Sequence, residues 1–152
     1  MKENLSFEIL AKSISGVNYR AGNAAKGAVN QLMTMRNWAI GYFIVEYEQS
    51  GKDRAEYGSD LLNNLERQIN ERGMNSTLFK WCRLFYLMYP QISATVSHQF
   101  NIPEIKKSAT ASHEFVTSAE KIVNNLSFSH IREIMVIKDP AERFFYETEC
   151  MK

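Results

Sequence analysis

The fold expected for this chain rests on one stretch, Gly73-Met74-Asn75-Ser76-Thr77-Leu78-Phe79-Lys80-Trp81-Cys82-Arg83-Leu84-Phe85-Tyr86-Leu87-Met88-Tyr89-Pro90. Gly73 can adopt the positive φ that ends a preceding helix. Asn75 or Ser76 can cap a new helix, because their side-chain oxygens accept the free N–H groups of a first turn. Pro90 cannot continue that helix. The stretch therefore predicts a tight turn followed by a helix over 76–89.

A second helix is expected before this turn. Asp53 can cap it, and an apolar stripe at helical spacing continues to about Arg72. The stripe consists of Tyr57, Leu61, Leu62, Leu65 and Ile69. A helix, a short turn containing glycine and a further helix form the outline of a helix-turn-helix. The sequence thus predicts an all-α (mainly α) fold with a helix-turn-helix-like core.

The helix predicted over 76–89 is apolar on nearly all sides, and such a helix is normally buried. Its polar residues are Ser76, Thr77, Lys80 and Arg83. Positions 76, 80 and 83 share one side of a helix, near its N-terminal end. Because a recognition helix presents its N-terminal residues to base edges, DNA could meet this narrow strip only.

Upstream, the apolar spacing predicts a short helix over 5–14, broken by Ser15-Gly16, and a long helical pattern from about 18 to 49. Gly41 lies inside the long pattern, although glycine costs about 1 kcal/mol relative to alanine there. It therefore indicates a place where another backbone comes close. Aromatic residues gather from Trp38 to Tyr47, so the thickest part of the core is expected there.

Downstream, residues 91–117 are polar and weakly patterned, and they contain Pro103. Segments 93–97 and 99–102 could pair as a short β wing, and a long loop is the alternative.

Three short helices are expected after this region. Thr117 and Glu120 have the spacing of a capping box. Ser127 or Ser129 can cap a helix over 130–136, and Asp139-Pro140 is a strong start signal for a helix over 140–151.

Length and composition fit a single globular domain over 1–152. Hydrophobic residues make up 45% of the 152 residues, which argues against disorder. No apolar run could span a bilayer, and no secretory signal is visible. The two cysteines, Cys82 and Cys150, fit reduced thiols, so a cytoplasmic location is expected and membrane association is not.

Positive charge is concentrated around the predicted turn and helix, although the net charge of the chain is only +1. Between 72 and 113 the single acid Glu104 opposes five basic residues. These are Arg72, Lys80, Arg83, Lys106 and Lys107. A basic block suits a polyanion such as DNA, and an ordinary solvated surface is the alternative.

No catalytic constellation is apparent. His98, His113 and His130 lack partners at metal-ligand spacing, and Cys82 on an apolar helix favours a core position over a nucleophile. Glu104-Ile105-Lys106 imitates the acid-x-Lys end of some metal-dependent nucleases, but no upstream acid supports it. We therefore expect no catalytic residue, metal site, cofactor or small-molecule substrate.

Several short runs, taken together and in order, resemble the N-terminal domain of the YhcG-like family of bacterial proteins. They are Trp38-Ala39-Ile40-Gly41 with Ile44, Tyr57-Gly58 with Leu61-Leu62 and Leu65, Phe85-Tyr86, Tyr89-Pro90, Leu126-Ser127-Phe128-Ser129-His130, Lys138-Asp139-Pro140 and Phe145-Tyr146-Glu147. The resemblance implies a helical domain that binds DNA through a helix-turn-helix and precedes a nuclease domain of the PD-(D/E)XK type. The sequence in hand carries the first part only, so nuclease activity is not implied for it.

Two functions follow as expectations. The first is a DNA-binding accessory module, in which Lys80 and Arg83 approach phosphates or guanine edges. Ser76 and Thr77 would meet phosphates through hydroxyl and backbone N–H groups, and Arg72, Lys106 and Lys107 would add backbone contacts. The second is an interaction module that docks a nuclease domain or forms a homodimer. The apolar helix over 76–89 and the aromatic run 144–146 motivate this alternative.

Overall fold

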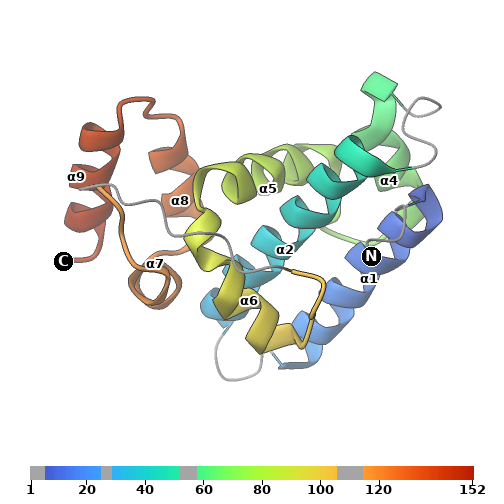
Figure 1. The fold of residues 1–152 in the computed structure, drawn as a ribbon, viewed down its shortest axis with the longest axis horizontal. Helices are drawn as coiled ribbons and strands as arrows, with labels where there is room; N and C mark the ends of the chain where they lie inside the picture. The colour runs from blue at the N-terminus through green and yellow to red at the C-terminus, as the bar shows by residue number, and fades with distance from the viewer. Residues whose placement is uncertain (1–5, 25–28, 52–57, 106–114) are drawn as a thin grey trace.

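The computed structural model describes residues 6–24, 29–51, 58–105 and 115–152 (Figure 1). Within these residues the chain forms helices and no strand, which confirms the predicted all-α class. The elements in chain order are α1 (Phe7–Ala24), α2 (Val29–Ser50), the 3₁₀ turn η2 (Gly58–Asp60), α4 (Leu61–Ile69), α5 (Ser76–Met88), the 3₁₀ turn η3 (Pro90–Ile92), α6 (Ser93–Phe100), α7 (Ala119–Asn125), α8 (Phe128–Met135) and α9 (Pro140–Cys150).

Helix α2 is the centre of the molecule. Every residue from 37 to 45 is buried, so the prediction of a thick core near Trp38 to Tyr47 is confirmed. Helix α5 packs along α2, while α1, α6, α7 and α8 also contact it. A helix that is apolar on all sides is stable in such a position, because neighbours cover each side of it.

Helices α2 and α5 come into close backbone contact at Gly41 of α2. A Cβ atom placed there would be 2.0 Å from the carbonyl oxygen of Cys82 and 2.9 Å from the Cβ of Tyr86, both on α5. Only the absence of a side chain permits this distance. The expectation that Gly41 lets another backbone come close is therefore confirmed, and the partner is α5.

Aromatic side chains fix the rotation of the two helices around this contact. The indole Nε1 of Trp38 donates a hydrogen bond of 2.8 Å to the carbonyl of Tyr89, just beyond the end of α5. The Trp38 ring meets the edge of Tyr86 with centroids 5.1 Å apart. Because a buried indole N–H needs an acceptor, the Trp38 bond also removes an unsatisfied donor from the core.

Helix α1 corrects one sequence prediction. It continues through Ser15-Gly16, where a break was expected, and it includes residues 18–24 of the long pattern. The reason is that Ile14, Val17 and Ala21 extend one fully buried side across the glycine. That burial outweighs the roughly 1 kcal/mol helix penalty of a single glycine.

The region after α5 corrects a second prediction. Residues 93–100 form α6, so neither the β wing nor a long loop is present over those positions. Ile92, Val96 and Phe100 are spaced four residues apart and are all buried, which gives the segment one apolar helical side. Within the region 91–117, residues 106–114 lie outside the described residues.

Helix α9 is attached to the rest of the fold by a polar contact. Its only buried residue is Glu147, which is 3% exposed. The Glu147 carboxylate accepts hydrogen bonds from the Tyr89 hydroxyl, at 2.6 Å, and from the Thr117 hydroxyl. A buried carboxylate is tolerated only with such donors. Thr117 is thus engaged with α9 and does not cap α7, contrary to the predicted capping box.

The other caps are set by local sequence. Ser118 caps α7 by accepting the N–H of Lys121 at 3.3 Å. Ser127, one of the two predicted candidates, caps α8, and the predicted Asp139 cap of α9 is confirmed.

The contact at Gly41 leads to a prediction for stability. Gly41→Ala should lower the free energy of unfolding by about 1–3 kcal/mol or more, because the added methyl group meets backbone atoms that cannot rotate away. Urea denaturation monitored by circular dichroism measures this change.

Gly22→Ala is the matched control. Gly22 is exposed in α1 and a Cβ there would have no neighbour within 4 Å. This substitution should stabilise the protein by up to about 1 kcal/mol through helix propensity. Equal effects at the two glycines would contradict the proposed packing of α2 on α5.

The buried Cys82 thiol and Tyr89 hydroxyl lead to a prediction for the pH dependence of stability. Burial raises the pKa of the Cys82 thiol, and burial together with the Glu147 hydrogen bond raises the pKa of Tyr89. A raised folded-state pKa gives stability that is complete below the unfolded pKa and is lost as pH rises above it. The free energy of unfolding should therefore fall above pH ~8.5, where the unfolded thiol ionises, by up to about 1.4 kcal/mol per pH unit.

Urea titrations between pH 8 and 10 test this slope. Cys82→Ala should flatten it, whereas Cys150→Ala should not, because Cys150 is exposed. An unchanged slope in Cys82→Ala would contradict the assignment.

Candidate nucleic-acid interface

The turn that precedes α5 is formed by two residues with positive φ. Helix α4 ends at Ile69, and its C-cap is Asn70 with φ 47°, not Gly73 as expected. Asparagine tolerates this left-handed region better than most residues. Gly73, with φ 82°, makes a second reversal a few residues later.

Two contacts hold this turn on the body of the protein. Met74 is buried, and the carboxylate of Glu71 accepts a 2.5 Å hydrogen bond from the side chain of Asn18 on α1. The predicted order of helix, turn and helix is present in α4, residues 70–75 and α5. That this unit acts as a DNA-binding helix-turn-helix stays a prediction.

The N-terminus of α5 is already occupied by the protein's own acceptors. Asn75, one of the two predicted candidates for the cap, accepts the N–H of Leu78 at 2.8 Å. The carboxylate of Glu66 on α4 accepts the N–H of Ser76, also at 2.8 Å. A carboxylate at this position competes with a phosphate for the same positive end of the helix. The expected phosphate contact through the Ser76 N–H is therefore disfavoured.

Lys80 and Arg83 lie on the exposed side of α5. Lys80 is exposed and makes no hydrogen bond or ion pair with another described residue. The Nε of Arg83 lies 2.6 Å from the Glu48 carboxylate, near the end of α2, and the two side chains are 44% and 35% exposed. Exposed pairs of this kind contribute less than about 1 kcal/mol, so a stronger anion can displace Glu48.

The remaining predicted residues divide into two groups. Arg72, in the turn before α5, and Thr77 are exposed, and Ser76 is half-buried. Lys106 and Lys107 lie outside the described residues.

Beyond Arg83, the exposed side of α5 becomes apolar. Leu84 is half-buried and Leu87 is 48% exposed. The strip thus has a basic half near the turn and an apolar half near α8.

Arg132 of α8 is an additional basic residue that the sequence reasoning missed. Its guanidinium carbon lies 4.8 Å from the ring centroid of Trp81, which follows Lys80 on α5. No local pattern could have revealed this contact, because the two residues are 51 positions apart in the chain.

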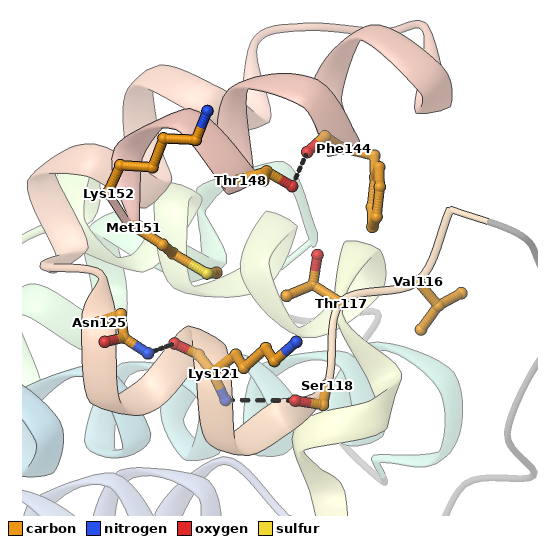
Figure 2. Close-up of a pocket in the computed structure, with 9 residues that line it drawn as sticks. All are labelled: Val116, Thr117, Ser118, Lys121, Asn125, Phe144, Thr148, Met151 and Lys152. Atoms are coloured by element: carbon orange, nitrogen blue, oxygen red, sulfur yellow. Dashed lines mark hydrogen bonds between the residues drawn. The ribbon is translucent and has the colours of Figure 1, made fainter.

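The described residues also contain a pocket of about 400 Å³ between α7 and α9 (Figure 2). Its lining consists of Val116, Thr117, Ser118, Lys121, Asn125, Phe144, Thr148, Met151 and Lys152. None of the residues predicted to bind DNA lines it. The pocket is lined by both apolar and polar side chains, and it contains no cluster of catalytic groups.

Aromatic side chains project from the outer side of α9. Phe145 is 56% exposed and Tyr146 is 43% exposed. Phe144 packs against Phe115 with ring centroids 5.9 Å apart. The rings of Phe145 and Tyr146 lie edge to face with centroids 5.3 Å apart, so they form one exposed aromatic pair on α9.

The described part of the chain has neither a candidate metal site nor a helix suited to span a membrane. It contains no group of three or more His, Cys, Asp or Glu side chains placed to hold a metal ion. It also contains no helix with the length and hydropathy needed to cross a membrane.

Comparison with known proteins identifies the family. The model of the DUF1016 N-terminal domain matches residues 13–152. The chain belongs to this family.

A curated relative from Escherichia coli (strain K12) is named "Putative nuclease YhcG" and is 30% identical over 136 residues. The aligned region covers 82% of this chain but 36% of the relative. The chain thus spans about a third of that protein, and the predicted resemblance to the N-terminal domain of the YhcG-like family is confirmed. No solved structure matches the chain significantly.

Proposed function

We propose that this domain is a DNA-binding accessory module of a nuclease-family protein and that it contacts DNA with the outer side of α5. The observation that carries the proposal is the placement of Lys80. It is exposed on α5 and shares that side of the helix with Arg83, three residues further along. The inner sides of α5 pack against α2 and the core, so this strip is the part of the helix that a partner can reach.

The family supports the same function. The relative YhcG carries the name of a nuclease, and a nuclease acts on nucleic acid. A helical domain that precedes or accompanies such an enzyme could bind the same nucleic acid and position the enzyme on it. The domain itself would contribute binding and no catalysis, and a cytoplasmic location fits that role.

The geometry favours contacts to phosphates over contacts to base edges. Glu66 and Asn75 occupy N–H groups at the N-terminus of α5, where a recognition helix would meet the bases. The exposed cations are few and lie on one shallow strip. Phosphate contacts position a protein on DNA without reading its sequence. We therefore propose binding with weak sequence preference.

A salt series with a duplex of mixed sequence tests the proposal. Affinity should fall steeply between 50 and 200 mM salt, since binding to DNA phosphates releases counterions. Lys80→Ala should weaken binding and make the slope of log K against log salt shallower by about 0.9, the value for one lost phosphate contact. Fluorescence anisotropy of a labelled duplex measures both quantities.

Two further variants sharpen the result. Lys121→Ala removes one exposed cation from α7 and should change the slope little, because α7 lies away from α5 (Figure 1). Glu48→Gln should tighten binding, because it removes a negative charge and releases Arg83. A gain of affinity cannot arise from misfolding. Absence of binding at 20 mM salt, or binding without salt dependence, would refute the proposal.

A second candidate function is a protein-interaction or dimerisation module. The observation that favours it is the outer side of α9, where Phe145 and Tyr146 are exposed in the isolated chain. Exposed aromatic surface of this kind marks contact sites. The occupant would be a second copy of the domain or the remainder of a longer nuclease protein.

Light scattering of the purified domain tests the homodimer form of this candidate. A dimer should form with rising concentration, and Phe145→Ser with Tyr146→Ser should shift it to monomer. Tyr19→Ser on α1 is the control, because Tyr19 is 71% exposed and lies on another helix. A domain that remains monomeric at high concentration would count against dimerisation.

A further inference from the structure

Arg132 stands out among the basic residues because an aromatic ring holds it beside the α5 strip. It is exposed on α8, and its guanidinium carbon lies 4.8 Å from the ring centroid of Trp81. Trp81 is half-buried and lies about 100° around the α5 axis from Lys80, on the flank that meets α8, so the contact brings a second cation to the edge of the surface that contains Lys80. A guanidinium at this distance from an indole ring is attracted by the ring's negative face.

The charge of Arg132 is not neutralised by a partner in the described part of the protein. It makes no hydrogen bond or ion pair with a residue of 6–24, 29–51, 58–105 or 115–152. Its neighbour Glu133 is also exposed, but successive residues on a helix point in directions about 100° apart. Arg132 therefore differs from Arg83, whose guanidinium is paired with Glu48.

The contact with Trp81 leaves the N–H groups of Arg132 available, since none of them donates a hydrogen bond to a described residue. A guanidinium that lies on an aromatic ring uses its flat face, while its N–H groups point outward in the plane. Those N–H groups match a phosphate in a bidentate manner. Because the ring restricts the long side chain before any ligand arrives, binding loses less conformational entropy.

We propose that Arg132 is a DNA-backbone contact and that Trp81 is its positioning residue, so that the binding surface extends from α5 onto α8. The proposal rests on the proposed DNA-binding function and deepens it in two ways. It adds a helix to the surface, and it names the residue of that helix that would contact the phosphate backbone.

The same contact disfavours the stacking of a single-stranded base on Trp81. Proteins that hold single strands stack the bases on open aromatic rings. Here the guanidinium covers the Trp81 ring, so a base could stack on that face only by displacing Arg132. Trp81 therefore supports a backbone contact, and duplexes of unrelated sequence should be bound alike.

Arg132→Gln is the decisive variant, because it removes the charge and keeps a side chain that can cover the ring. It should weaken binding severalfold, by the same factor for two duplexes of unrelated sequence, and make the salt slope shallower by about 0.9. Arg132→Lys should keep the slope of the wild type, because the charge remains, while its affinity falls, because the bidentate geometry is lost. Lys121→Gln on α7 is the charge-matched control and should change neither quantity.

Tryptophan fluorescence separates a contact role from a structural one. The emission of Trp81 is obtained as the difference between wild type and Trp81→Phe. This emission should remain largely unquenched when the protein is saturated with duplex. Strong quenching of this signal by a single strand would show base stacking and overturn the proposed mode.

The two levels of the proposal can fail separately. If the wild type binds duplex with a steep salt slope and Arg132→Gln behaves as Lys121→Gln does, the role of Arg132 is refuted and the DNA-binding function stands. A lower melting temperature in Arg132→Gln with an unchanged salt slope would assign Arg132 a structural role only. Absence of wild-type binding at 20 mM salt would refute both.

Discussion

The close contact of α2 and α5 at Gly41 is the constraint on which the rest of the structure depends. With the Cys82 carbonyl 2.0 Å from where a Cβ would stand, the two helices touch through their backbones. The Trp38 hydrogen bond to Tyr89 and the aromatic contacts then fix how α5 is rotated. This rotation buries Phe79, Cys82 and Phe85 and turns Lys80 outward. The surface available for a partner is thus decided by packing inside the core.

The fold also limits what that surface can do. Two carboxylates engage groups that could otherwise bind an anion. Glu66 accepts the Ser76 N–H, and Glu48 pairs with Arg83. A helix N-terminus that is occupied in this way is a poor reader of bases. In the proposed function, the cations that remain available would bind phosphates without reading the DNA sequence.

The C-terminal helices are joined to the core differently. Helix α9 buries a carboxylate, Glu147, and not an apolar stripe, and it leaves Phe145 and Tyr146 exposed. A buried carboxylate with two hydroxyl donors fixes geometry more than it adds stability. In the proposed interaction, the exposed aromatic side of α9 would serve as the contact surface.

The sequence by itself determined the class of the fold, the starts of α5 and α9, the role of Gly41 and the family. Caps such as Asn75 and Asp139 could be recognised because a cap depends on residues three or four positions away. The sequence misjudged α6 and the uninterrupted α1, because burial by distant helices outweighed local signals. Only the tertiary structure brought Arg132 to Trp81, Glu48 to Arg83 and Glu147 to Tyr89. These pairs are separated by 51, 35 and 58 positions, and such contacts exist only after the helices have packed.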